Sequence, residues 1–159
     1  MPTAKQAAAV KQLLVVSVVL ICFFGMLAYR SANEEHKKRN PMAQDLSLMK
    51  FLNSGIDNPS MKSILVGMSS GVVFGFIDNA GLFFGMDALD PYLPGGPLSK
   101  AGYGNTYSDA LGSFLSVFIG SLIQKSTGIE NTPMWSESVG IILGCLLGIH
   151  IPKMITGKK

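Results

Sequence analysis

The sequence predicts an all-α membrane protein: an N-terminal anchor helix followed by a glycine-ladder bundle of three transmembrane helices. Three observations lead to this fold class. Only 14% of the 159 residues are charged and 48% are hydrophobic, whereas a soluble domain carries about 25% charged residues. Long apolar segments recur along the chain. Three of these segments carry a small residue at every fourth position, and two of them belong to an internal repeat.

Residues 1–30 contain the clearest membrane span. The apolar run 13–29 lies between Lys11 and Arg30, and about 20 helical residues cross the ~30 Å hydrocarbon core of a bilayer. A cleavable signal peptide is the alternative, because basic residues precede the run. No pair of small residues suitable for cleavage follows it. We therefore expect an uncleaved transmembrane anchor.

Residues 31–53 read as a basic linker that contains one short helix. The first part is a solvated run of mixed charge, and the net charge of the whole chain is only +3. Asn40 and Pro41 have the residue types of an N-cap and a first helical position. Apolar residues then recur at helical spacing up to Leu52. The linker helix is expected to lie on the membrane or to bind a partner.

Three apolar segments follow, near residues 60–77, 108–124 and 134–151, and each carries a ladder of small residues. Such residues let helix backbones approach closely in lipid, where hydrophobicity does not drive helices together. A glycine-lined pore is the other use of such ladders. The residues predicted to pack helices are Gly67, Gly71, Gly75, Gly112, Ser116, Gly120, Gly140, Gly144 and Gly148.

Residues 54–75 align without a gap to residues 127–148, with nine of 22 positions identical. One apolar segment lies between the copies, so both copies run in the same direction, as a parallel repeat requires. Each copy opens with a capping residue and a proline, which predicts helices that begin at Pro59 and Pro133. Nineteen residues then reach Ile77 and Ile151, which is about 28 Å. The membrane unit is expected to cover 54–152, with a basic tail over 153–159.

The repeat places Asp78 in the last turn of a helix, near the membrane surface. Asn79, Ala80 and Gly81 then read as a helix stop, with Gly81 in the left-handed cap. We expect Asp78 to pair there with Asn105 or Thr106. A single helix over 60–86 would instead place Asp78 at mid-depth and favour an ion site. The residues predicted to form a polar interface or loop are Asp78, Asn79, Asp87, Asp90 and Asp109.

The residues between these helices, 86–107, are predicted to form an ordered polar loop that docks a partner. Its "KAGYGN" string is similar to a potassium-channel filter. Lys100 and Ala101 replace the filter's threonine and valine, and the preceding prolines prevent a pore helix. We expect a glycine-rich turn there, followed by a helix that starts near Ser108 and Asp109.

The sequence indicates no enzyme, no metal site, no cofactor and no nucleic-acid binding. The two histidines are far apart and lack the context of a catalytic motif. Both cysteines, Cys22 and Cys145, lie in apolar runs without a metal-ligand neighbour, which is typical of small buried hydrophobic residues. The expected partners are the lipid bilayer, other membrane or capsid proteins, and further copies of the chain.

The segment "FGFIDNAGLFFGMDALDP" (74–91), with the glycine ladders and the repeated I-[DE]-N frame, resembles small membrane proteins of large icosahedral DNA viruses of the phycodnavirus type. The resemblance covers mainly residues 54–150. It implies a structural minor-capsid component in the host-derived internal membrane of a virion, anchoring that membrane to the overlying capsid proteins. The alternative is a small oligomeric channel or translocation component built from glycine-ladder helices.

Overall fold

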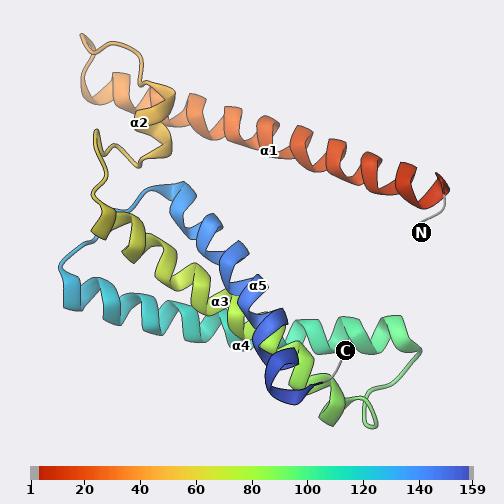
Figure 1. The fold of residues 1–159 in the computed structure, drawn as a ribbon. Coiled ribbons are helices and arrows are strands. Elements are labelled where there is room, and N and C mark those ends of the chain that lie inside the picture. The colour runs from red at the N-terminus through yellow and green to blue at the C-terminus, as the bar shows by residue number, and fades with distance from the viewer. Residues whose placement is uncertain (1–3, 158–159) are drawn as a thin grey trace. The chain divides into compact units, whose positions relative to one another are not determined.

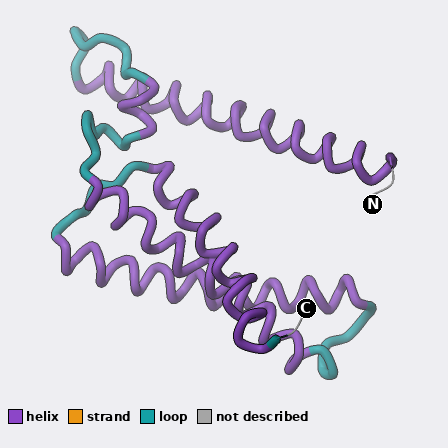
Figure 2. Tube along the Cα trace, viewed as in Figure 1, coloured by secondary structure: helices purple, strands orange, loops and turns teal. Residues whose placement is uncertain are grey.

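The computed structural model describes residues 4–157, and these residues form an all-α protein without β-strands. Figures 1 and 2 show how the helices are arranged within the chain. The helices are α1 (Ala4–Arg39), α2 (Leu48–Leu52), α3 (Met61–Leu89), α4 (Pro97–Thr127) and α5 (Met134–Thr156). The four long helices are each long and apolar enough to cross a membrane.

The chain divides into two compact units, residues 1–51 and 52–159, which we describe separately. In the first unit, α1 continues through the charged segment to Arg39. The expected linker at 31–39 is therefore wrong. Four basic residues occupy the last turn of α1, where the helix dipole favours positive charge. Arg39 also pairs with Glu35 at the i,i+4 spacing that stabilises helices.

Residues 40–47 fold back onto the end of α1. The Tyr29 hydroxyl donates to the backbone oxygen of Leu46 at 2.5 Å. The Leu46 N–H donates to the Asn33 side chain at 2.7 Å, and the Asn33 amide donates to Asp45 at 2.9 Å. Lys37 forms an ion pair with Asp45. These contacts order the segment without a helix.

The short helix α2 begins later than the sequence predicts. Asn40 and Pro41 lie in a turn, so the prediction of an N-cap at Asn40 is wrong. The Ser47 hydroxyl instead accepts the N–H of Lys50 at 3.1 Å, which is the usual capping contact. Asn-Pro ends α1 here because the residue before proline avoids helical geometry.

In the second unit, α3 packs against both α4 and α5, while α4 and α5 share almost no contact with each other. Gly67 of α3 lies beside Ser136 near the start of α5, and Gly75 lies beside Cys145 further along. These neighbours show that α3 and α5 run parallel. The chain direction reverses between α3 and α4, which cross as an antiparallel pair (Figure 1).

Helix α3 is one continuous helix of 29 residues. It begins at Met61 with Ser60 as the N-cap, whose side chain accepts the N–H of Ser63. The prediction of a stop at 79–81 is wrong, and Gly81 has no positive φ. The Asn79 amide donates to the Gly75 carbonyl of its own helix at 3.2 Å. Gly81 provides space for Ser108 of α4 rather than a left-handed cap.

The expected loop over 86–107 is reduced to a short connection between Leu89 and Pro97. Pro97 is the first residue of α4 and follows Gly96 as the N-cap, a position that suits proline. The "KAGYGN" string is helical, so the predicted turn is wrong and no filter-like strand exists there. Gly95 has φ +92°, which a residue with a side chain adopts only with strain.

Helix α4 ends at Gly128, which caps it in the left-handed conformation at φ 68°. Helix α5 begins at Met134, one residue after Pro133, and continues through Pro152 to Thr156. The predicted end at Ile151 is therefore wrong. Proline at position 152 removes one backbone hydrogen bond to Gly148. The Pro152 ring is buried within the unit.

Candidate functional site

The closest contact in the second unit is the backbone-to-backbone approach of α3 and α5. A Cβ atom at Gly71 would collide with the backbone oxygen of Glu137, and one at Gly144 would collide with that of Val72. At Gly148 it would lie 2.7 Å from the Phe76 oxygen. All six glycines predicted on these helices meet such a neighbour closer than 3.0 Å: Gly67, Gly71, Gly75, Gly140, Gly144 and Gly148.

The third set of small residues lies on α4, against α3. Gly112 lies beside the backbone oxygen of Phe74, and Gly120 lies beside the Cβ of Ser70. The buried residues of α4 follow one four-residue spacing, which places them on one stripe of the helix. They are Gly104, Ser108, Gly112, Ser116 and Gly120.

Burial in this unit is the reverse of that in a soluble domain. The buried hydrophobic residues of the described chain are Val66 and Ala80, and the other buried positions are mostly glycine, serine and proline. Large apolar side chains such as Phe114 and Leu122 are exposed. A surface of this kind suits lipid, and small residues at the helix contacts are typical of membrane bundles.

A cluster of polar side chains lies within this contact region, around Asp78. The midpoint of α3 is residue 75, so Asp78 lies about 5 Å beyond it along the helix axis. The Ser108 hydroxyl, fully buried on α4, donates to Asp78 Oδ1 at 2.8 Å. Asp78 is therefore near mid-helix and bonded to α4. The predicted pairing of Asp78 with Asn105 or Thr106 is wrong. Its partner Ser108 lies less than one turn further along α4.

The second carboxyl group of the cluster is that of Asp109, on α4. It lies within hydrogen-bonding range of the Asp78 carboxyl group. The Asn105 amide donates to Asp109 Oδ2 at 2.7 Å. Asn79 completes the cluster from α3, with its amide 3.5 Å from Asp78 Oδ2. Three of the predicted polar residues, Asp78, Asn79 and Asp109, thus lie together.

The cluster has the chemistry of a helix-to-helix polar contact or of a proton or cation site. Carboxyl groups at membrane depth are costly unless they are paired, and they often mark ion pathways. Among the side chains that the structure describes, no group of three or more histidine, cysteine, aspartate or glutamate residues is placed to hold a metal ion. Within the second unit, the Cys145 thiol of α5 interacts with the Asn79 side chain.

The other two predicted polar residues lie away from the cluster. Asp90 is the C-cap of α3 and pairs with Lys100 of α4 at 3.3 Å. The Lys100 ammonium also donates to the Asp90 backbone oxygen at 2.7 Å. This pair closes the connection between the two helices. Asp87 lies in the last turns of α3, and its side chain is outside the described part of the structure.

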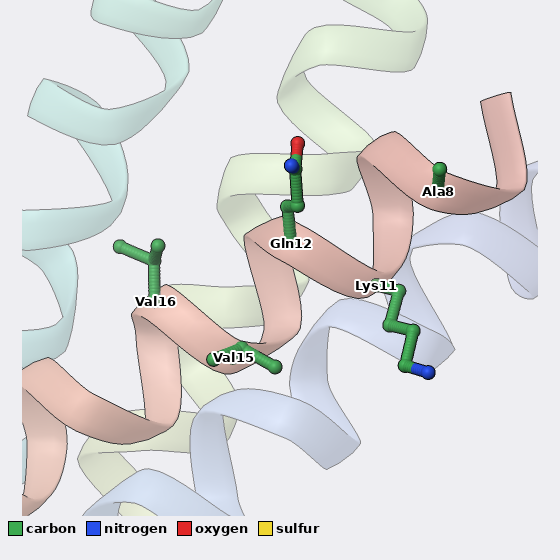
Figure 3. A pocket seen from close by; sticks show the side chains of 5 residues that line it. All are labelled: Ala8, Lys11, Gln12, Val15 and Val16. Atoms are coloured by element: carbon green, nitrogen blue, oxygen red, sulfur yellow. The ribbon is translucent and has the colours of Figure 1, made fainter. Parts of the chain in front are cut away.

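A hollow on the first unit has no functional chemistry. Figure 3 shows the five side chains that line it, all from α1. They offer one charged group, Lys11, and one amide, Gln12, and the remaining side chains are Ala8, Val15 and Val16. Because one helix face supplies them all, they do not converge on a ligand.

Sequence reasoning missed Gly104 and Ser108, which continue the α4 stripe by two steps. Their four-residue spacing from Gly112 is visible in the sequence. The spacing is not recognised when "KAGYGN" is interpreted as a turn, because the helix is then expected to start only near Ser108. It also missed the hydrogen bond from the Trp135 indole to Asn53 at 3.1 Å, which joins α5 to the residues before α3.

The fold and the candidate site identify the broad class of protein to which this chain belongs. Four helices that could cross a membrane, an apolar exterior and small residues at the helix contacts indicate a membrane protein. No protein-family model, curated protein or solved structure matches the chain.

Proposed function

We propose that the chain is a structural integral membrane protein, whose second unit is a rigid transmembrane scaffold. The observation that carries this proposal is the backbone-to-backbone contact of α3 and α5. Helices in such close contact leave no room between them for a ligand or a moving side chain. The parallel repeat accounts for the contact, because both of its copies supply glycines to the same interface.

The proposed setting is the internal membrane of a large icosahedral DNA virus, beneath the capsid. The resemblance of residues 74–91 supports this setting. The short connection between α3 and α4 is the polar surface offered to a capsid partner. Tyr92 in this connection and Leu98 in the first turn of α4 are the most exposed large apolar side chains of the region, at 85% and 88%. Tyrosine is a typical anchor of protein interfaces, and Leu98 adds an exposed apolar contact beside the connection.

Detergent extraction of purified virions tests the proposal. The full chain with a C-terminal affinity tag is expected to co-purify with capsid proteins identified by mass spectrometry. A Tyr92→Ala/Leu98→Ala variant is expected to lose them. Met154→Ala, which truncates an equally exposed residue on α5, is the matched control and is expected to keep them. The proposed setting is rejected if the chain is absent from virions. It is also rejected if the unmodified chain, the double variant and the control all capture the same capsid proteins.

The Asp78–Asp109 pair favours a second candidate, a small channel or translocation component. Reconstituted liposomes test this candidate through a proton or potassium flux assay. A leak that is lost in Asp78→Ala and Asp109→Ala, and kept in Ser126→Ala near the end of α4, would replace the structural proposal. Liposomes that stay tight with the unmodified chain would reject the channel.

A further inference from the structure

The second unit has an open groove between α4 and α5. Because both helices pack on α3 and not on each other, α3 forms the floor of this groove. Its volume is about 260 Å³. The lining residues are Phe74 from α3, Ser113, Ser116 and Val117 from α4, and Glu137 and Ile141 from α5.

Polar side chains continue from Ser113 in the groove lining along the same edge of α4 toward the start of the helix. Asn105, Asp109 and Ser113 follow one another at four-residue spacing and therefore share one edge of the helix. Asn105 is exposed and Asp109 is half-buried. The Asn105 amide already donates to Asp109, but lipid offers no partner for the remaining hydrogen-bonding capacity of these groups, so leaving this edge open to lipid is costly. A protein surface with a hydrogen-bond donor would remove that cost.

The outward face of α5 carries such a donor, His150. His150 lies two residues beyond Gly148, which contacts α3. Two positions along a helix differ in direction by about 200° around its axis. The exposed imidazole therefore points away from α3. The apolar residues Leu143 and Leu147, also partly exposed, precede it on this half of the helix.

His150 and Asp109 lie at nearly the same depth in the unit. Gly148 is beside Phe76 and Ala80 of α3, so His150 is level with the residues just after Ala80. Asp109 is level with Asp78, because its neighbour Ser108 bonds to Asp78. The two depths differ by about one helical turn, or roughly 5 Å.

We propose that a second copy of this chain covers the groove, seating the outward face of its α5 there so that its His150 imidazole donates to Asp109. In a ring of copies around the membrane normal, each residue keeps its depth in every copy. A donor for Asp109 must therefore lie within side-chain reach of that depth, and His150, about one helical turn away, meets this condition. The contact is head-to-tail, and repeated contacts of this kind close into a ring when the rotation between neighbouring copies divides a full turn.

This inference rests on the membrane insertion included in the proposed function, but not on a capsid partner. Disulfide trapping in lipid nanodiscs tests it, with the full chain carrying Cys22→Ser and Cys145→Ala as background. Asp109→Cys and His150→Cys are introduced into separate chains. A cross-linked dimer is expected only when the two variants are mixed. Leu111→Cys, two residues along α4 and on its other side, is the matched control for Asp109→Cys and is expected to give no cross-link.

Association measured by analytical ultracentrifugation provides the second readout. Asp109→Ala and His150→Ala are each expected to raise the midpoint concentration of association by about 3- to 30-fold, the range for one interhelical hydrogen bond in a membrane. The exchanged variant Asp109→His/His150→Asp is expected to recover most of that loss. A monomer at every concentration, cross-links within a single variant, or equal cross-linking of Leu111→Cys would overturn the inference. A monomer that still binds capsid proteins would overturn this inference and leave the proposed function standing.

Discussion

Alanine at Gly144 is expected to destabilise the second unit, although alanine normally favours a helix. Its Cβ would lie 2.9 Å from the backbone nitrogen of Phe76 and the carbonyl carbon of Val72, and closer still to the Val72 oxygen. Ordinary contact begins near 3.4 Å, so α3 and α5 must separate by at least about 0.5 Å. None of these neighbours can rotate away, because all are backbone atoms.

The size of the effect follows from two opposing terms. A gap of about 0.5–1 Å removes a quarter to a half of the dispersion attraction between the atoms involved, and overpacking costs about 1–3 kcal/mol. The higher helix propensity of alanine offsets up to about 1 kcal/mol of this cost. We expect Gly144→Ala to lower the free energy of unfolding by about 1–2 kcal/mol.

Gly102→Ala is the matched control. Gly102 also lies within a helix, and a Cβ there has nothing within 4 Å. Only the propensity term remains, so this variant is expected to gain about 0.5–1 kcal/mol. The two alanines should therefore change stability in opposite directions.

Unfolding in mixed micelles by sodium dodecyl sulfate measures both variants. The chain has one tryptophan, and the Trp135 indole is bonded to Asn53 in the folded unit. Its fluorescence therefore reports on the separation of α5 from the residues before α3. A Gly144→Ala midpoint equal to or above that of Gly102→Ala would refute the close-contact reasoning.

Three further variants test other contacts. Ser108→Ala removes the donor to the Asp78 carboxyl group, and the same unfolding assay is expected to show a loss of about 0.6–2 kcal/mol; an unchanged midpoint would mean that this bond contributes nothing. The pKa of Asp45 is held below its ordinary value by hydrogen bonds, chiefly from Lys37. The contact therefore stabilises the folded-back segment above the ordinary pKa of aspartate and is lost as pH falls through the lowered pKa. NMR titration is expected to show this lowered pKa and its return toward the ordinary value in Lys37→Ala; identical titration curves would contradict it. Gly128→Ala forces alanine to φ +68° at the end of α4 and is expected to cost about 1 kcal/mol, whereas a gain in stability would show that the helix end shifts.

The sequence predicted where the helices contact one another better than where they begin and end. Glycines such as Gly71 and Gly144 stand out because their four-residue spacing persists through apolar segments. This spacing is a property of one chain segment and needs no partner to be recognised. The neighbours that each glycine meets, such as Val72 for Gly144, depend on the packing of two helices and are not visible in one segment.

The helix ends were misplaced because the signals used for them are turn signals of water-soluble proteins. Asn79 and Gly81 would stop a helix in water. In α3 the Asn79 amide bonds to its own helix, and Gly81 makes space for Ser108. One of the two glycines of "KAGYGN" has a related role, since Gly104 lies against Met86, whereas a Cβ at Gly102 would meet nothing within 4 Å. A small residue therefore marks close contact in this bundle more often than a chain reversal.

The central position of α3 determines the order in which this protein can be assembled during synthesis. The hairpin of α3 and α4 is complete once Thr127 has been made, yet one side of α3 is then uncovered. The glycines on that side of α3 contact α5, because Gly71 meets Ile141, and α5 leaves the ribosome after α3 and α4. A chain truncated before α5 would hold a groove of bare backbone facing lipid, which makes such fragments natural substrates for membrane quality control.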